Sequence, residues 1–152
     1  MREASRYLTW LTAGIMLVAW VLNVDQMESL AFQRERDYRN ISGLVVMGLV
    51  LFQWGLTLGR TVFQRSGSQW SGWVDWHLRS ALVLPFAMLA HSIAYGWGLL
   101  ILLPLSLLAA AHFGSMLNDE VALRKNLKYH IAFSALTLAL TVAHAVTVLT
   151  FN

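Results

Sequence analysis

Four of the five histidines in this 152-residue chain fall into two pairs with the same spacing. His77 and His91 are 14 residues apart, and His130 and His144 are 14 residues apart as well. Fourteen helical residues make almost a whole number of turns, so both imidazoles of a pair project from nearly one face, roughly 21 Å apart along the axis. The spacing predicts two helices that carry nitrogen ligands at two matched heights.

The composition predicts that these helices lie in lipid. Hydrophobic residues make up 57% of the chain and charged residues 12%, against about 25% charged in soluble domains. Stretches without Asp, Glu, Lys or Arg cover residues 7–24, 40–59, 80–118 and 129–152. A membrane-spanning helix takes about 20 residues, so the third stretch must fold back, and Gly96 and Gly98 supply a turn.

We therefore expect an all-α fold, a polytopic membrane bundle with a cytoplasmic amino terminus. Residues 1–152 would form one transmembrane domain with five transmembrane helices at about 7–24, 40–63, 76–95, 98–117 and 128–150. The orientation follows from the positive-inside rule, because one side receives Arg2, Arg6, Arg60, Arg65, Arg79, Arg124, Lys125 and Lys128.

Residues at the ends of the expected helices indicate where the protein lies in the cell. The first stretch lacks a small-x-small cleavage site and is interpreted as a retained span rather than a signal peptide. Trp70, Trp73 and Trp76 lie just before the expected third helix, where indoles settle at the headgroups. We expect a multi-pass protein of the bacterial cytoplasmic (inner) membrane, in contact with lipid. Topology explains the basic residues, so no nucleic-acid partner is expected.

The third and fifth expected helices are separated by one span and must run parallel. His77 would then face His130 at the cytoplasmic level, and His91 would face His144 at the outer level. The chain has no cysteine, which excludes thiolate sites and iron–sulfur clusters. Zinc would need its ligands gathered in one tetrahedron. Two facing imidazoles instead suit a six-coordinate haem iron, which favours electron transfer, so we expect two bis-histidine haem b groups with these four residues as metal ligands.

Two further residues each have alternative roles. Arg79 lies near the cytoplasmic surface, where it would bind a haem propionate or serve only as topogenic charge. His112 falls in the expected fourth helix toward the cytoplasmic level. It could be an alternative axial ligand, a partner of a quinone headgroup or a propionate, or an interfacial histidine with no such role. It is left out of the ligand set.

The pattern resembles the membrane haem domain of ferric reductases and NADPH oxidases, the ferric-reductase-like transmembrane domains, and more distantly cytochrome b. The resemblance covers roughly residues 40–150: an apolar helix ending at Gly59 and Arg60, one histidine pair, a short return helix, and the second pair. It implies that electrons enter at the cytoplasmic haem and leave at the outer one, to a metal, oxygen, a quinone or a protein.

The sequence departs from that family in three respects. Leu78 and Ile131 follow the first histidines where the family often has arginine, and no glycine lies between the members of either pair. These 152 residues also contain no dinucleotide fingerprint, so we expect no flavin or nicotinamide domain in this chain. A separate flavoprotein, a quinol or a cytochrome would then supply the electrons.

Three functions stay open at this point. The first is a di-haem b-type cytochrome acting as the electron-transfer subunit of a redox complex. The second is an oxidoreductase in its own right, which uses a quinone site to oxidise or reduce a quinol. The third is a haem-free membrane anchor or assembly subunit whose histidines hydrogen-bond between helices.

Overall fold

The computed structural model describes residues 2–22, 28–61, 68–92, 99–117 and 121–151. Five α-helices and one 3-10 helix form this part of the chain, and it contains no strand. They are α1 (Arg2–Val21), η2 (Glu28–Arg34), α2 (Arg36–Thr61), α3 (Ser68–His91), α4 (Leu99–Ser115) and α5 (Leu123–Phe151). The predicted all-α fold is confirmed for these residues.

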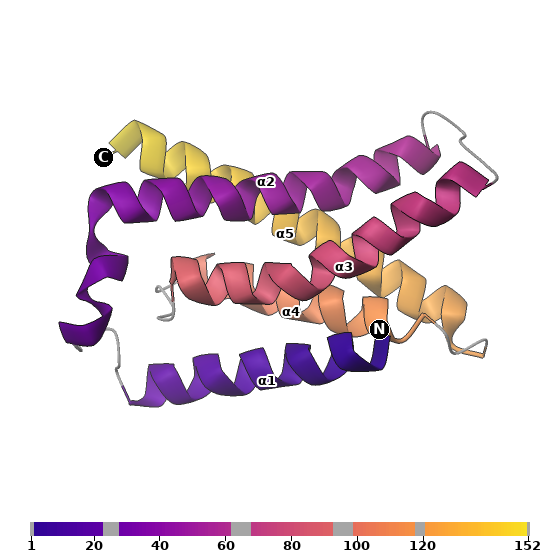
Figure 1. Ribbon diagram of the computed structural model, residues 1–152, viewed down its shortest axis with the longest axis horizontal. Coiled ribbons are helices and arrows are strands. Elements are labelled where there is room, and N and C mark those ends of the chain that lie inside the picture. The colour runs from indigo at the N-terminus through magenta and orange to yellow at the C-terminus, as the bar shows by residue number, and fades with distance from the viewer. Residues whose placement is uncertain (1, 23–27, 62–67, 93–98, 118–120, 152) are drawn as a thin grey trace.

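The five α-helices lie side by side with alternating directions (Figure 1). One end of the molecule holds the starts of α1, α3 and α5, and the other holds the starts of α2 and α4. Helices α3 and α5 therefore run in the same direction, as predicted. The closest neighbours are α4 with α5 and α2 with α3, while α1 packs against α3 and α4.

Most of the helices begin before the uncharged stretches that predicted them. Helix α3 starts at Ser68 rather than near residue 76, so Trp70, Trp73 and Trp76 lie inside it and not just before it, as was expected. The helix includes this charged section because Asp75 and Arg79, one turn apart, form an ion pair of 2.8 Å that is compatible with helical structure. The uncharged stretch marks the apolar section of a helix and not its boundary.

The other end of α3 is fixed by contacts from η2 and the start of α2. Helix α3 ends at His91, while the predicted end at residue 95 and the predicted turn at 95–98 lie outside the described residues. The last carbonyls of a helix lack partners within it. Here Gln33 Nε2 donates to the carbonyls of Leu89 and Ala90, and Tyr38 Oη donates to Ala90.

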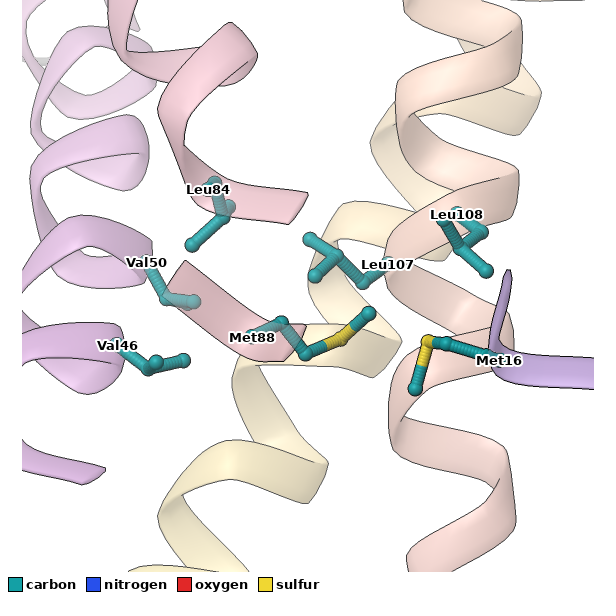
Figure 2. Packing of buried hydrophobic residues seen from close by; sticks show 7 residues of the cluster. All are labelled: Met16, Val46, Val50, Leu84, Met88, Leu107 and Leu108. Carbon is teal, nitrogen blue, oxygen red and sulfur yellow. The ribbon is translucent and has the colours of Figure 1, made fainter. Parts of the chain in front are cut away.

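A small apolar core joins α1, α2, α3 and α4 (Figure 2). Its buried members are Met16, Val46, Val50, Leu84, Met88, Leu107 and Leu108. Leu84 and Met88 follow His77 by 7 and 11 residues, so they occupy the same face of α3, between the two histidines. The core therefore separates the two histidine levels.

Outside this core, the usual burial pattern of a soluble protein is inverted. Thr12 and Ser106 are each 1% exposed, whereas Leu149 is 80% exposed and Val21 67%. Large apolar side chains are exposed on every α-helix. Buried polar groups and large exposed apolar surfaces are the informative deviations from normal burial.

One helix of the described chain is long and apolar enough to cross a membrane: α5, over Leu123–Thr150. The segments Tyr7–Ala19 and Ile101–Ser115 are apolar helices of shorter length. Membrane association is therefore supported by one span, and the five-span topology stays a prediction.

Candidate functional site

The four paired histidines occupy one lengthwise stripe on α3 and one on α5. On α5, the residues 7 and 11 positions after His130 are Thr137 and Thr141, and both are buried. They mark the same inward face as His130 and His144, because these spacings return close to one helical direction. The predicted common face of each pair is thus the face that each helix turns inward.

The structure brings the predicted partners together at both levels. The ring centroids of His77 and His130 are 6.2 Å apart, and those of His91 and His144 are 6.5 Å apart. A metal–imidazole bond of about 2 Å, with the distance from that nitrogen to its ring centre added, puts two ring centres on opposite sides of one metal about 6 Å apart. Both observed separations fit one metal ion shared by two imidazoles.

The arrangement of α3 and α5 suits a metal ion shared between their histidines. Within the described residues, α3 and α5 lack the backbone interface that joins α4 to α5 and α2 to α3. The histidine rings of the two helices contact each other edge-on at both levels. The two ring planes of a pair are inclined by 89° and 68°. Rotation about a metal–nitrogen bond changes this angle, so it does not conflict with shared ligation.

The hydrogen bond of His130 assigns its tautomer. Its Nδ1 lies 2.8 Å from the carbonyl oxygen of Ala110 on α4. A carbonyl only accepts, so Nδ1 carries the hydrogen and Nε2 keeps its lone pair. Metal-binding histidines usually make this outer bond, which fixes the ring and makes the ligand nitrogen more basic.

His91 has the same tautomer for a different reason. Its Nδ1 lies 2.9 Å from Oγ of Ser42 on α2. The hydroxyl hydrogen of Ser42 is used in a bond of 2.7 Å to the carbonyl of Tyr38, so toward His91 the hydroxyl accepts. Nδ1 of His91 is then the donor, and Nε2 has a free lone pair.

Two glycines let a neighbouring helix approach these same rings. A Cβ on Gly43 of α2 would lie 3.2 Å from Cε1 of His91, and a Cβ on Gly114 of α4 would lie 2.9 Å from Nδ1 of His130. The glycines therefore keep the backbones of α2 and α4 in contact with the histidines. No sequence rule singled out Ser42, Gly43, Ala110 or Gly114; glycines inside apolar helices were the one available signal.

A cavity adjoins His77 and His130 between α2, α3, α4 and α5. Its volume is about 80 Å³, which is room for a few water molecules, so a larger ligand requires side chains to move outward. The buried Nδ1 of His77 has no hydrogen-bond partner among the described residues. The lining is mostly apolar: Val50, Gln53, Trp54, His77, Ala81, Leu84, Pro85, Leu107, Ala110, Ala111, His130, Ser134 and Thr137.

Arg79 and His112 contact residues other than the paired histidines. The Arg79 guanidinium pairs with Asp75, with 61% of its side chain exposed. The ring of His112 packs edge-on against Trp10 of α1, with centroids 5.2 Å apart. Ala110 and Gly114 contact His130, and residue 112, midway between them, points to the opposite side of α4. His112 therefore faces away from His130, and a propionate contact by Arg79 stays a prediction.

Each level thus offers two nitrogen donors. In the described ranges, no group of three or more His, Cys, Asp or Glu side chains is gathered as a metal site. Two nitrogen donors at this separation suit a cofactor that supplies its remaining ligands itself, and binding it at the His77 and His130 level would require the side chains around the cavity of about 80 Å³ to move.

Comparisons with known proteins add nothing to this geometry: no family model, no curated protein and no solved structure matches the chain.

Proposed function

We propose that the chain is a five-span di-haem cytochrome b of a membrane electron-transfer complex, similar to the ferric-reductase-like transmembrane domains. The observation that carries the proposal is the doubled histidine pair. Two helices place imidazoles 6.2 Å and 6.5 Å apart at two levels, and both spacings suit one metal between them. His77 and His130 would bind one haem, and His91 and His144 the other.

The surface of the bundle supports the membrane part of the proposal. Exposed large apolar side chains on every α-helix, together with buried Thr12, Ser106 and Thr137, suit a lipid environment. Four of the five α-helices have 20 residues or more, a length that matches about 30 Å of hydrocarbon, and α5 is in addition apolar enough to cross it. A multi-pass protein of a bacterial inner membrane, with its amino terminus in the cytoplasm, accounts for this surface and for the excess of basic residues at one end, where eight of the eleven fall.

Haem iron held by two imidazoles supplies a one-electron carrier without an open coordination position. The residues of this chain hold and tune it. The carbonyl of Ala110 and the hydroxyl of Ser42 keep Nε2 of His130 and His91 free to bind. The buried side chains of Leu84 and Met88 would separate the two haems. A flavoprotein, another cytochrome or a quinol would deliver the electrons, and a separate acceptor would take them.

Haem quantitation on the purified chain tests the proposal. The pyridine haemochrome assay should give about two haems b per chain, with the spectrum of bis-imidazole ligation. His91→Ala or His144→Ala should remove the outer haem and spare the cytoplasmic one. His77→Ala or His130→Ala should remove the cytoplasmic haem and spare the outer one.

His112→Ala is the matched control, because that ring faces α1 and should leave two haems bound. A haem-supplemented preparation without Soret absorbance would overturn the proposal in favour of a haem-free anchor subunit. Turnover of a quinol analogue by the isolated chain would instead identify an oxidoreductase in its own right.

A further inference from the structure

We infer that Ser42 is a positioning residue for the outer haem ligand His91 and tunes the reduction potential of that haem. The inference rests on the proposed function. It starts from the hydrogen bond of 2.9 Å between Ser42 Oγ and His91 Nδ1. Ser42 is on α2, whereas both histidines of the outer pair are on α3 and α5, so a third helix controls a ligand that it does not carry.

The hydroxyl of Ser42 can hold His91 because its own orientation is fixed. It donates to the carbonyl of Tyr38 one turn earlier, at 2.7 Å. Tyr38 in turn donates through Oη to Ala90 at 2.6 Å, and Gln33 donates to Ala90 at 3.0 Å. Ala90 precedes His91 at the end of α3. The backbone and the ring of the ligand are therefore held from the same segment, η2 and the first turns of α2.

The cytoplasmic level formed by His77 and His130, here called the inner level, is supported differently. His130 Nδ1 is bonded to the main-chain carbonyl of Ala110, which every residue at position 110 would supply. At the outer level the acceptor is a side-chain hydroxyl, which a substitution removes. The two haem sites should therefore differ in their response to side-chain substitution, although their histidines are equally spaced.

The first measurement uses haem-free protein. Nitrogen-15 chemical shifts of the His91 ring should report the Nδ1–H tautomer in the wild-type chain, and Ser42→Ala should abolish that preference. Ser42→Thr retains a hydroxyl that bonds to its own helix and should restore it. Ser115→Ala is the matched control, because Ser115 also bonds to its own helix, at the carbonyl of His112.

The second measurement uses the haem-loaded protein. Ser42→Ala should weaken binding of the outer haem about 10- to 100-fold, the usual effect of losing a partner of a ligating histidine. The potential of that haem should rise, because a less basic imidazole stabilises the ferric state less. The inner haem and the Ser115→Ala variant should be unchanged, and Ser42→Thr should restore the wild-type behaviour.

The outcomes separate the two claims. Two haems in the wild-type chain, with unchanged potential and affinity in Ser42→Ala, would overturn the role of Ser42 and leave the proposed function in place. A wild-type chain without haem would overturn both.

Discussion

Gly114 brings the backbone of α4 into direct contact with the His130 ring. A Cβ at this position would lie 2.9 Å from Nδ1 and 3.0 Å from Cε1 of that ring. Gly114→Ala should therefore displace the ring and break its bond to Ala110. We expect the affinity of the inner haem to fall about tenfold or more, with the outer haem retained, as measured by haem titration.

Gly48→Ala is the control for this substitution. Gly48 also lies inside a helix, but no atom would come within 4 Å of its Cβ. Replacing it should stabilise the helix by about 0.5–1 kcal/mol or have no effect. Equal loss of inner haem in both variants would contradict the role given to Gly114, since a general effect of glycine replacement would then explain it.

At the scale of the helices, a few polar contacts fix how α2 and α4 sit beside the histidine-bearing helices. Gln53 of α2 donates to Ser80 of α3 at 2.7 Å, and Trp54 donates to the carbonyl of Ser134 on α5 at 3.2 Å. Thr137 of α5 donates to Ser106 of α4 at 2.9 Å, where both are buried. These bonds matter in lipid, where hydrophobic association between helices is absent.

The contribution of the hydrogen bond between Thr137 and Ser106 to the packing of α4 on α5 can be measured directly. A double-mutant cycle with Thr137→Val and Ser106→Ala should give a coupling of about 0.6 kcal/mol, and at most roughly 1.7 kcal/mol. The free energy of unfolding in lipid bicelles measures it. Thr147→Val, whose hydroxyl bonds only within its own helix, should show no coupling to Ser106→Ala. A comparable coupling there would show that the cycle reports something other than the α4–α5 contact.

At the scale of the whole molecule, the alternating helix directions place the start of α2 and the start of α5 at opposite ends of the bundle (Figure 1). Asp37 is the second residue of α2, and Val121 lies two residues before α5. Both residues are exposed. The chain has no cysteine, so a single introduced cysteine can be labelled without background. In intact spheroplasts, a membrane-impermeant maleimide should modify Asp37→Cys, and it should reach Val121→Cys only after the membrane is opened.

The same labelling tests the number of spans. If both cysteines react from the outside, α2, α3 and α4 do not together cross the membrane three times, and the five-span topology is wrong. Labelling of Val121→Cys alone would reverse the orientation and put the His91 level in the cytoplasm.

The amino-acid sequence by itself was enough to predict the helices and the pairing of the four histidines. Helix geometry is set by local hydrogen bonds, so a separation of 14 residues fixes a common face whatever surrounds it. One helix, α4, lies between α3 and α5 in the sequence, so in a bundle of alternating helices α3 and α5 must run in the same direction. The boundaries were less predictable, because charges limit the apolar section of α3 without ending the helix at Asp75 or Arg79.

Tertiary structure alone decided what surrounds the rings. Ser42 is 49 residues from His91 in sequence, and Ala110 is 20 residues from His130, so no local pattern could predict either hydrogen bond. The same holds for the side of α4 on which His112 lies. These features depend on the rotation and depth at which neighbouring helices pack, which are set by the sum of many weak contacts along their length.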